Sequence, residues 1–497
     1  MKYDVVIIGS GLGGLQCAYM LSREGYNVCL IEKNQQLGGC LQTFKRDGST
    51  FDTGMHYIGG MDKGQVLYNF FRYLGLSEKL KLMRLDENGY DVVRYHDREY
   101  KFAMGYERFI DTLLQQFPGE LESITKYVSK LKEITQTASI YNLTELKDAK
   151  PEYFEYYSLS MDQFLDSIIT NPNLKRVLLS MSPLYAGVKN RTPLYIPMII
   201  HSTYIGSAYR FIDGGSQISD ILSASILENG GVIFNKTKAT RFIFESEKLM
   251  AVEVNNSNRI EGKYFIADIH PKRLLELIEG PQVRMSYRRR IAGIEETCGM
   301  FSLYLSLHEN SFRYKNYNIY GYDSDEFWET GNYSVQNWPQ GYMVHFSPVS
   351  YNPGFTNSVI VNTFMKWEEL KPWENTTVEN RGADYQAFKH QKAELLLDRV
   401  EKQLPGLKKS VRSSYTSTPL TYRDYIGSHE GSVYGIQRDY HNPLKAMILP
   451  RTHIPNLLLT GQNIGIHGVI GVTIGSVVTC SELLGMNYLI TKIRNAQ

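Results

Sequence analysis

The hydrophobic pattern at the start of the chain predicts a strand, a helix and a second strand. Lys2–Ile8 is a short run rich in Val and Ile, which is typical of a buried parallel strand. Apolar residues then recur at helical spacing over Leu12–Arg23, and Gly25 follows as a C-cap. Asn27–Ile31 is apolar again and leads into an acid, Glu32. This order of elements predicts an α/β domain at the N-terminus.

The glycines between the first strand and the helix match the fingerprint of a dinucleotide-binding turn. Residues 9–14 read GSGLGG, a G-x-G-x-x-G motif in the required strand–turn–helix context. Gly9 makes the tight turn, Gly11 lets backbone approach a pyrophosphate, and Gly14 lets the helix pack on the strand. The helix N-terminus faces the phosphates, and Glu32 can accept hydrogen bonds from ribose hydroxyls. The alternative is a glycine-rich turn that binds nothing.

The residues that follow narrow the dinucleotide to FAD. Gly38 and Gly39 allow a second close backbone approach near the phosphates. The stretch GGCLQTF…FDTGMHYIGG, residues 38–44 and 51–60, resembles the carotenoid isomerases and retinol saturases. That branch lies within the phytoene-desaturase-like FAD oxidoreductases. The resemblance implies an α/β fold: a glutathione-reductase-type FAD-binding Rossmann domain with an interleaved α+β substrate domain, and no separate NAD(P) domain.

The resemblance recurs along nearly the whole chain. Arg210 departs from the family pattern. It precedes a Gly-Gly segment before which related desaturases often have Pro, and a cation at this position would replace an apolar wall. The other matching segments are Phe117–Glu120, Asp213–Gln217, Thr418–Thr421, Gly431–Gly435, Leu457–Gln462 and Gly468–Gly471.

The pattern also divides the chain into alternating segments. Helical patterns dominate after residue 75, strand–helix alternation returns near residue 209, and strand patterns such as residues 300–306 follow. A chain of 497 residues is too long for one simple core. We therefore expect three FAD-domain segments, 1–75, 209–283 and 415–497, and two substrate-domain segments, 76–208 and 284–414.

The last segment carries the features expected near a flavin. Residues 456–460 read as a strand, and Gly461 then lets backbone pass close to the ribityl phosphate. A helix over residues 469–484 could direct its positive end at the flavin pyrimidine edge and stabilise the reduced state. The alternative is an apolar helix that only packs on the sheet. The complete expected FAD contact set is Gly9, Gly11, Leu12, Gly13, Gly14, Glu32, Lys33, Gly38, Gly39, Cys40, Thr53, Gly54, Met55, Ala239 (at the adenine, by resemblance), Gly461, Gln462, Val469 and Ile470.

Two histidines are the candidates for proton transfer or for anchoring a polar substrate end. His56 lies in the segment that the family places beside the flavin, and His467 precedes the closing helix. Tyr57 could equally line the flavin ring, while His345 and His429 have weaker claims. The alternative for each histidine is a packed ring that is hydrogen-bonded to backbone.

The composition of the chain limits the classes of function that it could have. Hydrophobic content of 42% and charge of 21% are ordinary for a globular protein, and a net charge of +2 gives no case for nucleic-acid binding. The 36 Tyr residues suit either an apolar tunnel or an aromatic core. No cysteine or histidine spacing suggests a metal site, and five scattered cysteines favour a reducing, cytoplasmic setting, with Cys40 structural.

No signal peptide and no membrane span are expected from the sequence. A basic cluster of Arg284 and residues 288–290 surrounds Met285 and Tyr287. It could meet anionic lipid as a peripheral membrane contact, or it could be a solvated helix face.

The leading interpretation is an FAD enzyme that saturates, desaturates or isomerises carbon–carbon double bonds of an apolar isoprenoid or polyene, with hydride passing at flavin N5. A second G-x-G-x-x-G unit is missing, so NAD(P)H would act only as a transient reductant. Two alternatives remain open at this point: an amine-oxidase-like flavoprotein, and a non-catalytic carrier of apolar ligands that keeps FAD for structure.

Overall fold

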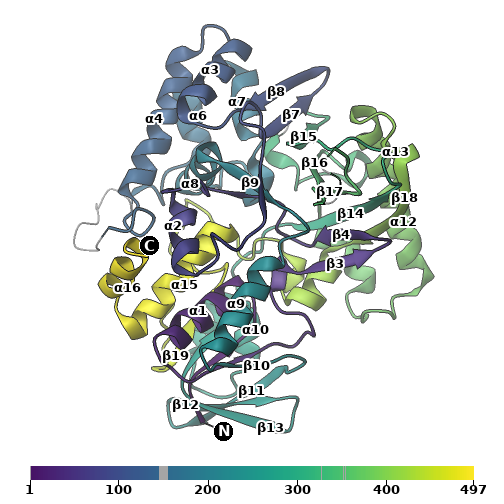
Figure 1. Cartoon of the computed structure of the whole chain (residues 1–497). Helices are drawn as coiled ribbons and strands as arrows, with labels where there is room; N and C mark the ends of the chain where they lie inside the picture. The colour runs from purple at the N-terminus through teal and green to yellow at the C-terminus, as the bar shows by residue number, and fades with distance from the viewer. Residues whose placement is uncertain (1, 145–154, 326, 351, 353, 497) are drawn as a thin grey trace.

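The first of two large sheets brings together segments from both ends and the middle of the chain (Figure 1). The structure, a computed structural model, describes residues 2–144, 155–325, 327–350, 352 and 354–496. The parallel part of this sheet runs in the order β10, β2, β1, β13 and β19, and β12 and β11 continue antiparallel from β13. Its strands are β1 (Lys2–Ile8), β2 (Val28–Ile31), β10 (Val232–Phe234), β11 (Ala239–Glu245), β12 (Lys248–Val254), β13 (Asn258–Ala267) and β19 (Leu457–Leu459).

Three helices pack together against this sheet: α1 (Leu12–Arg23), α9 (Gln217–Glu228) and α15 (Gly468–Leu484). Every residue of α1 from Leu12 to Ser22 is buried. The strand–glycine turn–helix–strand unit at the N-terminus, and the strand and helix at the C-terminus, are therefore confirmed. The arrangement explains why α1 and α15 are apolar around most of their circumference, since both lie between the sheet and other helices.

The second sheet has seven strands in the order β18, β14, β17, β16, β15, β7 and β8. Its two faces alternate along each strand. On β14, Phe301, Leu303 and Leu305 pack toward helix α12 (Gly382–Gln403), whereas Met300 belongs to a different core cluster. The strands are β7 (Asp91–Tyr95), β8 (Arg98–Phe102), β14 (Gly299–Leu307), β15 (Asn318–Tyr322), β16 (Gly341–Phe346), β17 (Ser358–Met365) and β18 (Val411–Ser417).

A group of helices forms the upper part of the molecule in Figure 1 and confirms the helical pattern predicted after residue 75. Its members share one large core with the face of the second sheet that lies away from α12. They are α3 (Tyr106–Gln116), α4 (Leu121–Thr137), α6 (Met161–Ile168), α7 (Pro172–Leu179) and α8 (Tyr195–Gly206). The other helices are α2 (Val66–Tyr73), α10 (Pro271–Glu276), α11 (Met285–Ala292), α13 (Leu407–Ser410), α14 (Pro419–Thr421) and α16 (Met486–Arg494).

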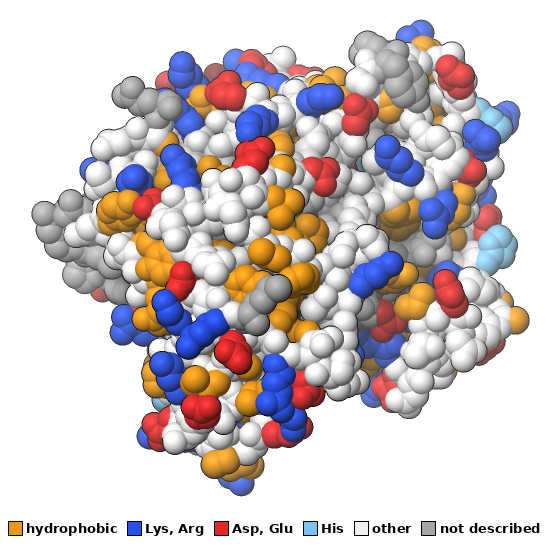
Figure 2. All heavy atoms as spheres, turned by 60° about the horizontal axis from the view of Figure 1, so that its bottom comes forward, with side chains coloured by type: hydrophobic (Ala, Val, Ile, Leu, Met, Phe, Trp, Pro, Cys, Tyr) orange, Lys and Arg blue, Asp and Glu red, His pale blue; other side chains and the backbone are white. Residues whose placement is uncertain are grey.

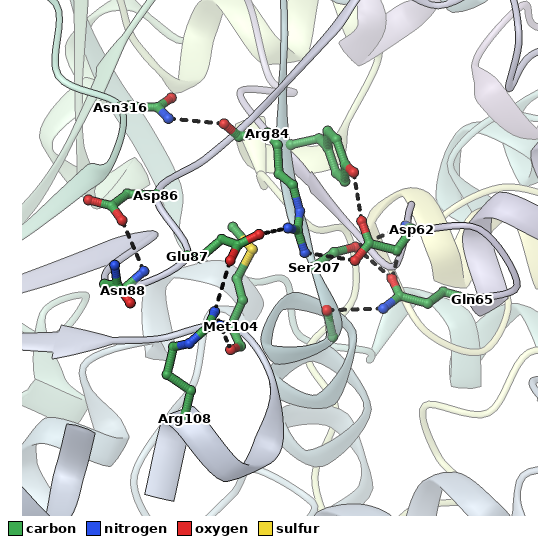
Figure 3. Close-up of polar contacts among 12 residues, drawn as sticks. Asp62, Gln65, Arg84, Asp86, Glu87, Asn88, Met104, Arg108, Ser207 and Asn316 are labelled. Carbon is green, nitrogen blue, oxygen red and sulfur yellow. Dashed lines mark hydrogen bonds and ion pairs between the residues drawn. The ribbon is translucent and has the colours of Figure 1, made fainter. Parts of the chain in front are cut away.

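A small sheet of β5 (Ile58–Gly59), β9 (Ala208–Phe211) and β6 (Leu82–Arg84) joins these parts, next to the hairpin of β3 (Thr43–Arg46) and β4 (Ser49–Asp52). Figure 3 shows the polar contacts around β6. Arg84 pairs with Asp62 at 2.8 Å and with Glu87, which also accepts from Arg108 at 3.1 Å. Asn316, from the loop before β15, donates to the Arg84 carbonyl at 3.0 Å. These contacts fix the loop before β15 of the second sheet to the small joining sheet.

The four boundaries between the five expected domain segments stay a prediction. The strands of the first sheet come from residues 2–31, 232–267 and 457–459, and those of the second from 91–102, 299–365 and 411–417. β18 therefore runs three residues beyond the boundary expected at residue 414.

Candidate active site

A cavity of about 950 Å³ runs past the carboxyl ends of the parallel strands and along the second sheet. This position is where ligands bind in open α/β sheets. The predicted contact residues that line it are Gly9, Gly11, Leu12, Gly13, Glu32, Lys33, Gly38, Gly39, Cys40, Gly54, Met55, Ala239, Gly461, Gln462 and Val469. Gly14, Thr53 and Ile470 do not line it.

The glycine turn encloses a carboxyl group that the sequence prediction missed. Asp268 follows the last residue of β13, and its Oδ2 accepts from the Gly14 backbone N–H at 2.9 Å. A Cβ at Gly11 would lie 2.5 Å from the same oxygen, and one at Gly461 would overlap Oδ1. Burial raises the Asp268 pKa to about 7, an effect that the Gly14 hydrogen bond opposes. Glycine is therefore required at these positions because the Asp268 side chain lies so close to them, as well as by any ligand.

Glu32 lies at the cavity wall directly after β2, and its contact with a ribose stays a prediction. One carboxylate oxygen accepts from the Ser10 backbone N–H at 3.0 Å and from its hydroxyl at 2.7 Å. The other accepts from the Asn34 N–H at 2.8 Å. These bonds fix the carboxylate in one orientation, while its remaining lone pairs can accept from ribose hydroxyls.

The adenosine part of the cavity is closed by a loop from the C-terminal third of the chain. Ala239 opens β11 there, beside Lys33 and Asn34. Lys33 Nζ donates to the Asp424 carbonyl at 2.7 Å, and Asn34 Nδ2 donates to the Tyr425 carbonyl at 2.8 Å. Burial lowers the Lys33 pKa. The π-helical turn holding Asp424 and Tyr425 therefore closes this part of the cavity, and no sequence motif had indicated it.

The opposite part of the cavity, here called the aromatic end, has an apolar wall. It is lined by Leu184, Met300, Met343, Val433 and the tyrosines Tyr57, Tyr204 and Tyr434, together with His56, His345 and Asn362. None of the described residues that line this end is a carboxylate, a lysine or an arginine. The aromatic end therefore suits a long uncharged ligand with few polar groups.

His56 lies in this wall, in the loop before β5. Asn362 Nδ2 donates to His56 Nε2 at 2.9 Å, so that the ring hydrogen is placed on Nδ1, which is buried without a partner. The ring stacks on His345 with 4.4 Å between centroids. Burial, together with a smaller effect of the Arg210 charge, lowers the His56 pKa to about 3. His56 is therefore neutral at ordinary pH, which favours hydrogen-bonding or proton-holding roles over that of a fixed cation.

His345 reaches the same wall from β16, 289 residues later in the chain. Its Nδ1 lies 2.9 Å from Asn318 Oδ1. Burial, followed by the charges of His56 and Arg210, holds the His345 pKa well below its usual value. The sequence prediction ranked this residue below His467.

Arg210 does not form part of the cavity wall. Its side chain is only 2% exposed and donates to Asn318 Oδ1 at 2.6 Å and to the Tyr314 hydroxyl at 2.9 Å. The expectation that a cation replaces an apolar wall is therefore wrong, because the guanidinium lies behind the residues that form the wall.

His467 caps α15 but does not line the cavity. Its ring lies against Tyr434 at 4.4 Å between centroids, and burial lowers its pKa to about 4. His429 lies outside the wall as well, 3.7 Å from Glu296. A catalytic role for His56 or His467 stays a prediction, but only His56 is placed to touch a ligand in this cavity.

The cysteines show no sign of redox chemistry. All five are free, and burial raises the Cys40 pKa to about 11, which disfavours the reactive thiolate. Among the described residues, no group of three or more His, Cys, Asp or Glu side chains could hold a metal ion.

The residues present fit a dinucleotide that continues into a flavin. The glycine turn leaves no room for side chains, Glu32 is held in a fixed orientation at the cavity wall, and the long cavity extends past the start of α15 to the aromatic end. His56 Nδ1 is a fully buried polar atom at that end with no hydrogen-bond partner among the described residues. The chain's own residues therefore provide a cradle for the phosphates and an apolar chamber beyond it.

Comparisons with known proteins agree with this geometry. Residues 7–74 match the model of an NAD(P)-binding Rossmann-like domain. An all-trans-retinol 13,14-reductase of Rattus norvegicus is 26% identical over 98% of this chain and 86% of its own length. A prolycopene isomerase of an Oncidium hybrid cultivar is 24% identical over 99% of this chain and 85% of its own length. The chain is a homologue of the carotenoid isomerase and retinol saturase branch. One relative from Danio rerio, 22% identical over 97% of this chain and 85% of its own length, is an inactive all-trans-retinol 13,14-reductase.

Solved structures share the fold. An oxidoreductase from Methanosarcina mazei superimposes with a TM-score of 0.63 at 15% identity, covering 96% of this chain and 99% of that one. A putrescine oxidase does so with a TM-score of 0.62 at 15% identity, covering 97% and 99%. The α/β fold with a Rossmann-like nucleotide-binding region is confirmed, and likeness at this level of identity shows the fold alone.

Proposed function

We propose that the protein is an FAD-dependent oxidoreductase that acts on carbon–carbon double bonds of an apolar isoprenoid or polyene. The observation that carries this proposal is the aromatic end, an uncharged chamber of tyrosine, methionine and neutral histidine beside a dinucleotide cradle. The homology along nearly the whole chain to a retinol reductase and a prolycopene isomerase supports it. We further assign the nucleotide-binding part to the glutathione-reductase type of FAD fold.

FAD would supply hydride transfer between flavin N5 and a substrate carbon. Ser10, Glu32 and the glycine turn would hold the pyrophosphate and ribose, and Gly461 would admit the ribityl chain. The walls at Met300 and Met343 would exclude water from the reacting carbons. His56 holds a proton on Nδ1 in the same wall, where it can donate a hydrogen bond or a proton.

An amine substrate is disfavoured by the charges of the site. An ammonium group in a protein is stabilised by a carboxylate or by aromatic rings; none of the described residues lining the aromatic end is acidic, so only its tyrosines could serve. The nearest buried cation, Arg210, lies behind the wall and repels a second positive charge. The likeness to a putrescine oxidase, at 15% identity, shows the fold alone and does not argue for an amine substrate.

A transient reductant, NAD(P)H, remains part of the proposal, since the chain shows a single dinucleotide motif. The relatives include both a reductase and an isomerase, so the same site architecture is compatible with saturation, desaturation and isomerisation. Because one relative is an inactive reductase, a ligand carrier without turnover remains the alternative function for this protein. The uncharged chamber would serve such a carrier equally well, and only turnover separates the two functions.

We also propose a peripheral membrane contact, for which the structure narrows the residues. Of the predicted basic cluster, Arg288 donates to the Ile278 carbonyl and Arg290 to the Met447 carbonyl at 3.0 Å, so both are engaged in holding α11. Met285, which is 63% exposed, and Arg289 remain available to lipid. Figure 2 shows hydrophobic side chains gathered near the middle of one face with Lys and Arg side chains around them. None of the helices in the described ranges is long and apolar enough to cross a membrane.

Anaerobic mixing of the FAD-loaded protein with a panel of ligands tests the proposal. The panel contains polyene alcohols, polyene hydrocarbons and primary amines, each added to oxidised and to reduced protein. The expected result is conversion of a polyene and no reduction of the flavin by amines. Flavin reduction by an amine, with every polyene recovered unchanged, would assign the protein to amine oxidation instead.

A further inference from the structure

The structure places a fixed chain of buried polar groups directly behind His345. Asn318 lies at the start of β15 with no exposed surface, and its amide has two different neighbours. Arg210 Nη2 donates to Asn318 Oδ1 at 2.6 Å, and Asn318 Nδ2 donates to Asp91 Oδ1 at 2.7 Å. A guanidinium can only donate, so the atom of the Asn318 amide that faces Arg210 must be its oxygen, and the amide N–H then points to Asp91. The orientation of the Asn318 amide is therefore determined by its neighbours.

This orientation determines which ring nitrogen of His345 carries the hydrogen. Asn318 Oδ1 is an acceptor, so His345 Nδ1, 2.9 Å away, must donate to it. A neutral ring that is protonated on Nδ1 has an unshared pair on Nε2. No hydrogen-bond partner of Nε2 exists among the described residues, and it is not one of the fully enclosed unpartnered atoms. Since His345 lines the cavity, Nε2 presents a hydrogen-bond acceptor to whatever occupies the aromatic end.

The remaining members of the chain hold Asp91 in place. Tyr57 donates its hydroxyl to Asp91 Oδ2 at 2.9 Å and lies 2.7 Å from the Tyr320 hydroxyl. The loop that leads to Asn318 is held in place two residues earlier, because Asn316 donates to the Arg84 carbonyl (Figure 3). The Asn316 carbonyl also accepts from the Asp86 N–H at 2.9 Å. Because most polar atoms of this buried network have hydrogen-bond partners, the network favours one arrangement of its side chains over others.

We infer that His345 Nε2 recognises a hydroxyl hydrogen on the substrate, and that Arg210, Asn318 and Asp91 are positioning residues that hold His345 in the required tautomer. The inference rests on the proposed function and assigns the residue that would distinguish a polyene alcohol from a polyene hydrocarbon. A hydrocarbon would leave the lone pair buried and unbonded, and an aldehyde or carboxylate would present only lone pairs to it. An ammonium donor is disfavoured by Arg210 behind Asn318.

Binding of a matched ligand pair tests the recognition step independently of turnover. All-trans-retinol and its methyl ether differ in the single hydrogen that His345 would accept. We expect the FAD-loaded protein to bind the alcohol about tenfold or more tightly than the ether, the scale of one unsatisfied buried acceptor. In His345→Phe the two ligands should bind within about twofold of each other, while the affinity for the ether is maintained. In His345→Gln, whose amide can accept at a similar position, the preference should persist.

His201→Phe is the matched control. His201 is also buried with a pKa lowered to about 3, but it does not line the cavity. The control should keep the full preference for the alcohol. Equal binding of alcohol and ether by the unmodified protein, or an unchanged preference in His345→Phe, would overturn the inference. Failure to bind either ligand would refute the proposed function together with the inference, whereas selective binding without turnover would refute only the enzymatic function.

Nitrogen-15 NMR of the histidine rings tests the positioning residues and still decides the matter if His345→Phe does not fold. The signal that is lost in His345→Gln identifies His345, and we expect it to show a neutral ring protonated on Nδ1. Asn318→Leu removes the acceptor and should shift that signal toward the Nε2-protonated form and lower the preference for the alcohol. An Nε2-protonated His345 in the unmodified protein would overturn the inference.

Discussion

The substitution Gly461→Ala tests the geometry of the cofactor cradle. Gly461 follows β19 and its backbone has a φ of +93°, a conformation that alanine rarely adopts. A Cβ there would also overlap Asp268 Oδ1, well inside the 3.0 Å that real Cβ contacts almost never fall below. Asp268 cannot simply move aside, because it accepts from the Gly14 N–H of the glycine turn.

The magnitude follows from these two effects. The left-handed backbone costs alanine roughly 1–2 kcal/mol. Displacing Asp268 leaves a buried N–H unbonded, which adds about 1–3 kcal/mol. We therefore expect a total destabilisation of roughly 2–5 kcal/mol. Because Gly14, Asp268 and Gly461 all belong to the cradle, most of this cost should appear as loss of bound cofactor.

Gly465→Ala separates the two effects. Gly465 has a φ of +76°, in the same segment, but no atom lies within 4 Å of its Cβ position. It should show the backbone cost alone and retain FAD. The assay is the FAD content of the purified variants together with their free energy of unfolding in urea. Adding Asp268→Ala should cost the Gly461→Ala variant less stability than it costs the unmodified protein, since the hydrogen bond to the Gly14 N–H is already lost. Equal FAD content and equal stability of the two glycine variants would refute the reasoning.

Three further predictions concern stability, architecture and the reaction. Burial raises the Asp52 pKa to about 7, above its value in the unfolded chain, so the contribution of Asp52 to stability is complete below pH 4 and is lost as the pH rises to 7. Asp52→Asn should therefore gain stability relative to the unmodified protein across this pH window, by up to roughly 4 kcal/mol. A stability difference in urea unfolding that does not depend on pH would contradict this prediction. A fragment of residues 1–285 should not bind FAD, because β19 and α15 complete the site; stoichiometric FAD in that fragment would disprove the interleaved arrangement. His56→Ala should keep FAD but lower turnover about 100-fold if the ring donates a proton, and unchanged turnover across pH would assign His56 to packing.

The nucleotide half of the site could be predicted from sequence because its parts are local. Gly9, Gly11 and Glu32 lie within one strand–helix–strand unit, and the spacing alone fixes their relation. Asp268 was also within reach, since an acid directly after a strand next to β1 must face the glycine turn. The missing step was the pairing of β13 with β1, which no local pattern states.

The aromatic end could not be predicted in the same way. His345 and Asn362 meet His56 only because β16 and β17 pair in one register, with both polar side chains on the face away from α12. A shift of one residue would turn them toward α12. Arg210 illustrates the same limit: its position in the sequence indicated the right neighbourhood, but burial decided that it acts through Asn318 rather than on the ligand.

The central claim is that this protein uses FAD to act on a carbon–carbon double bond of a polyene. A single-turnover experiment with the purified FAD-loaded protein tests it most directly. The protein is reduced chemically without oxygen, mixed with all-trans-retinol, and followed by the flavin spectrum and by mass analysis of the extracted lipid; a parallel sample uses oxidised protein. We expect a polyene product in at least one of the two samples. That product would gain two hydrogens as the flavin is reoxidised, lose two as the flavin is reduced, or keep the same mass with altered double-bond geometry. Recovery of unchanged polyene from both samples, with the ligand bound and the flavin spectrum constant, would contradict the account and leave a carrier.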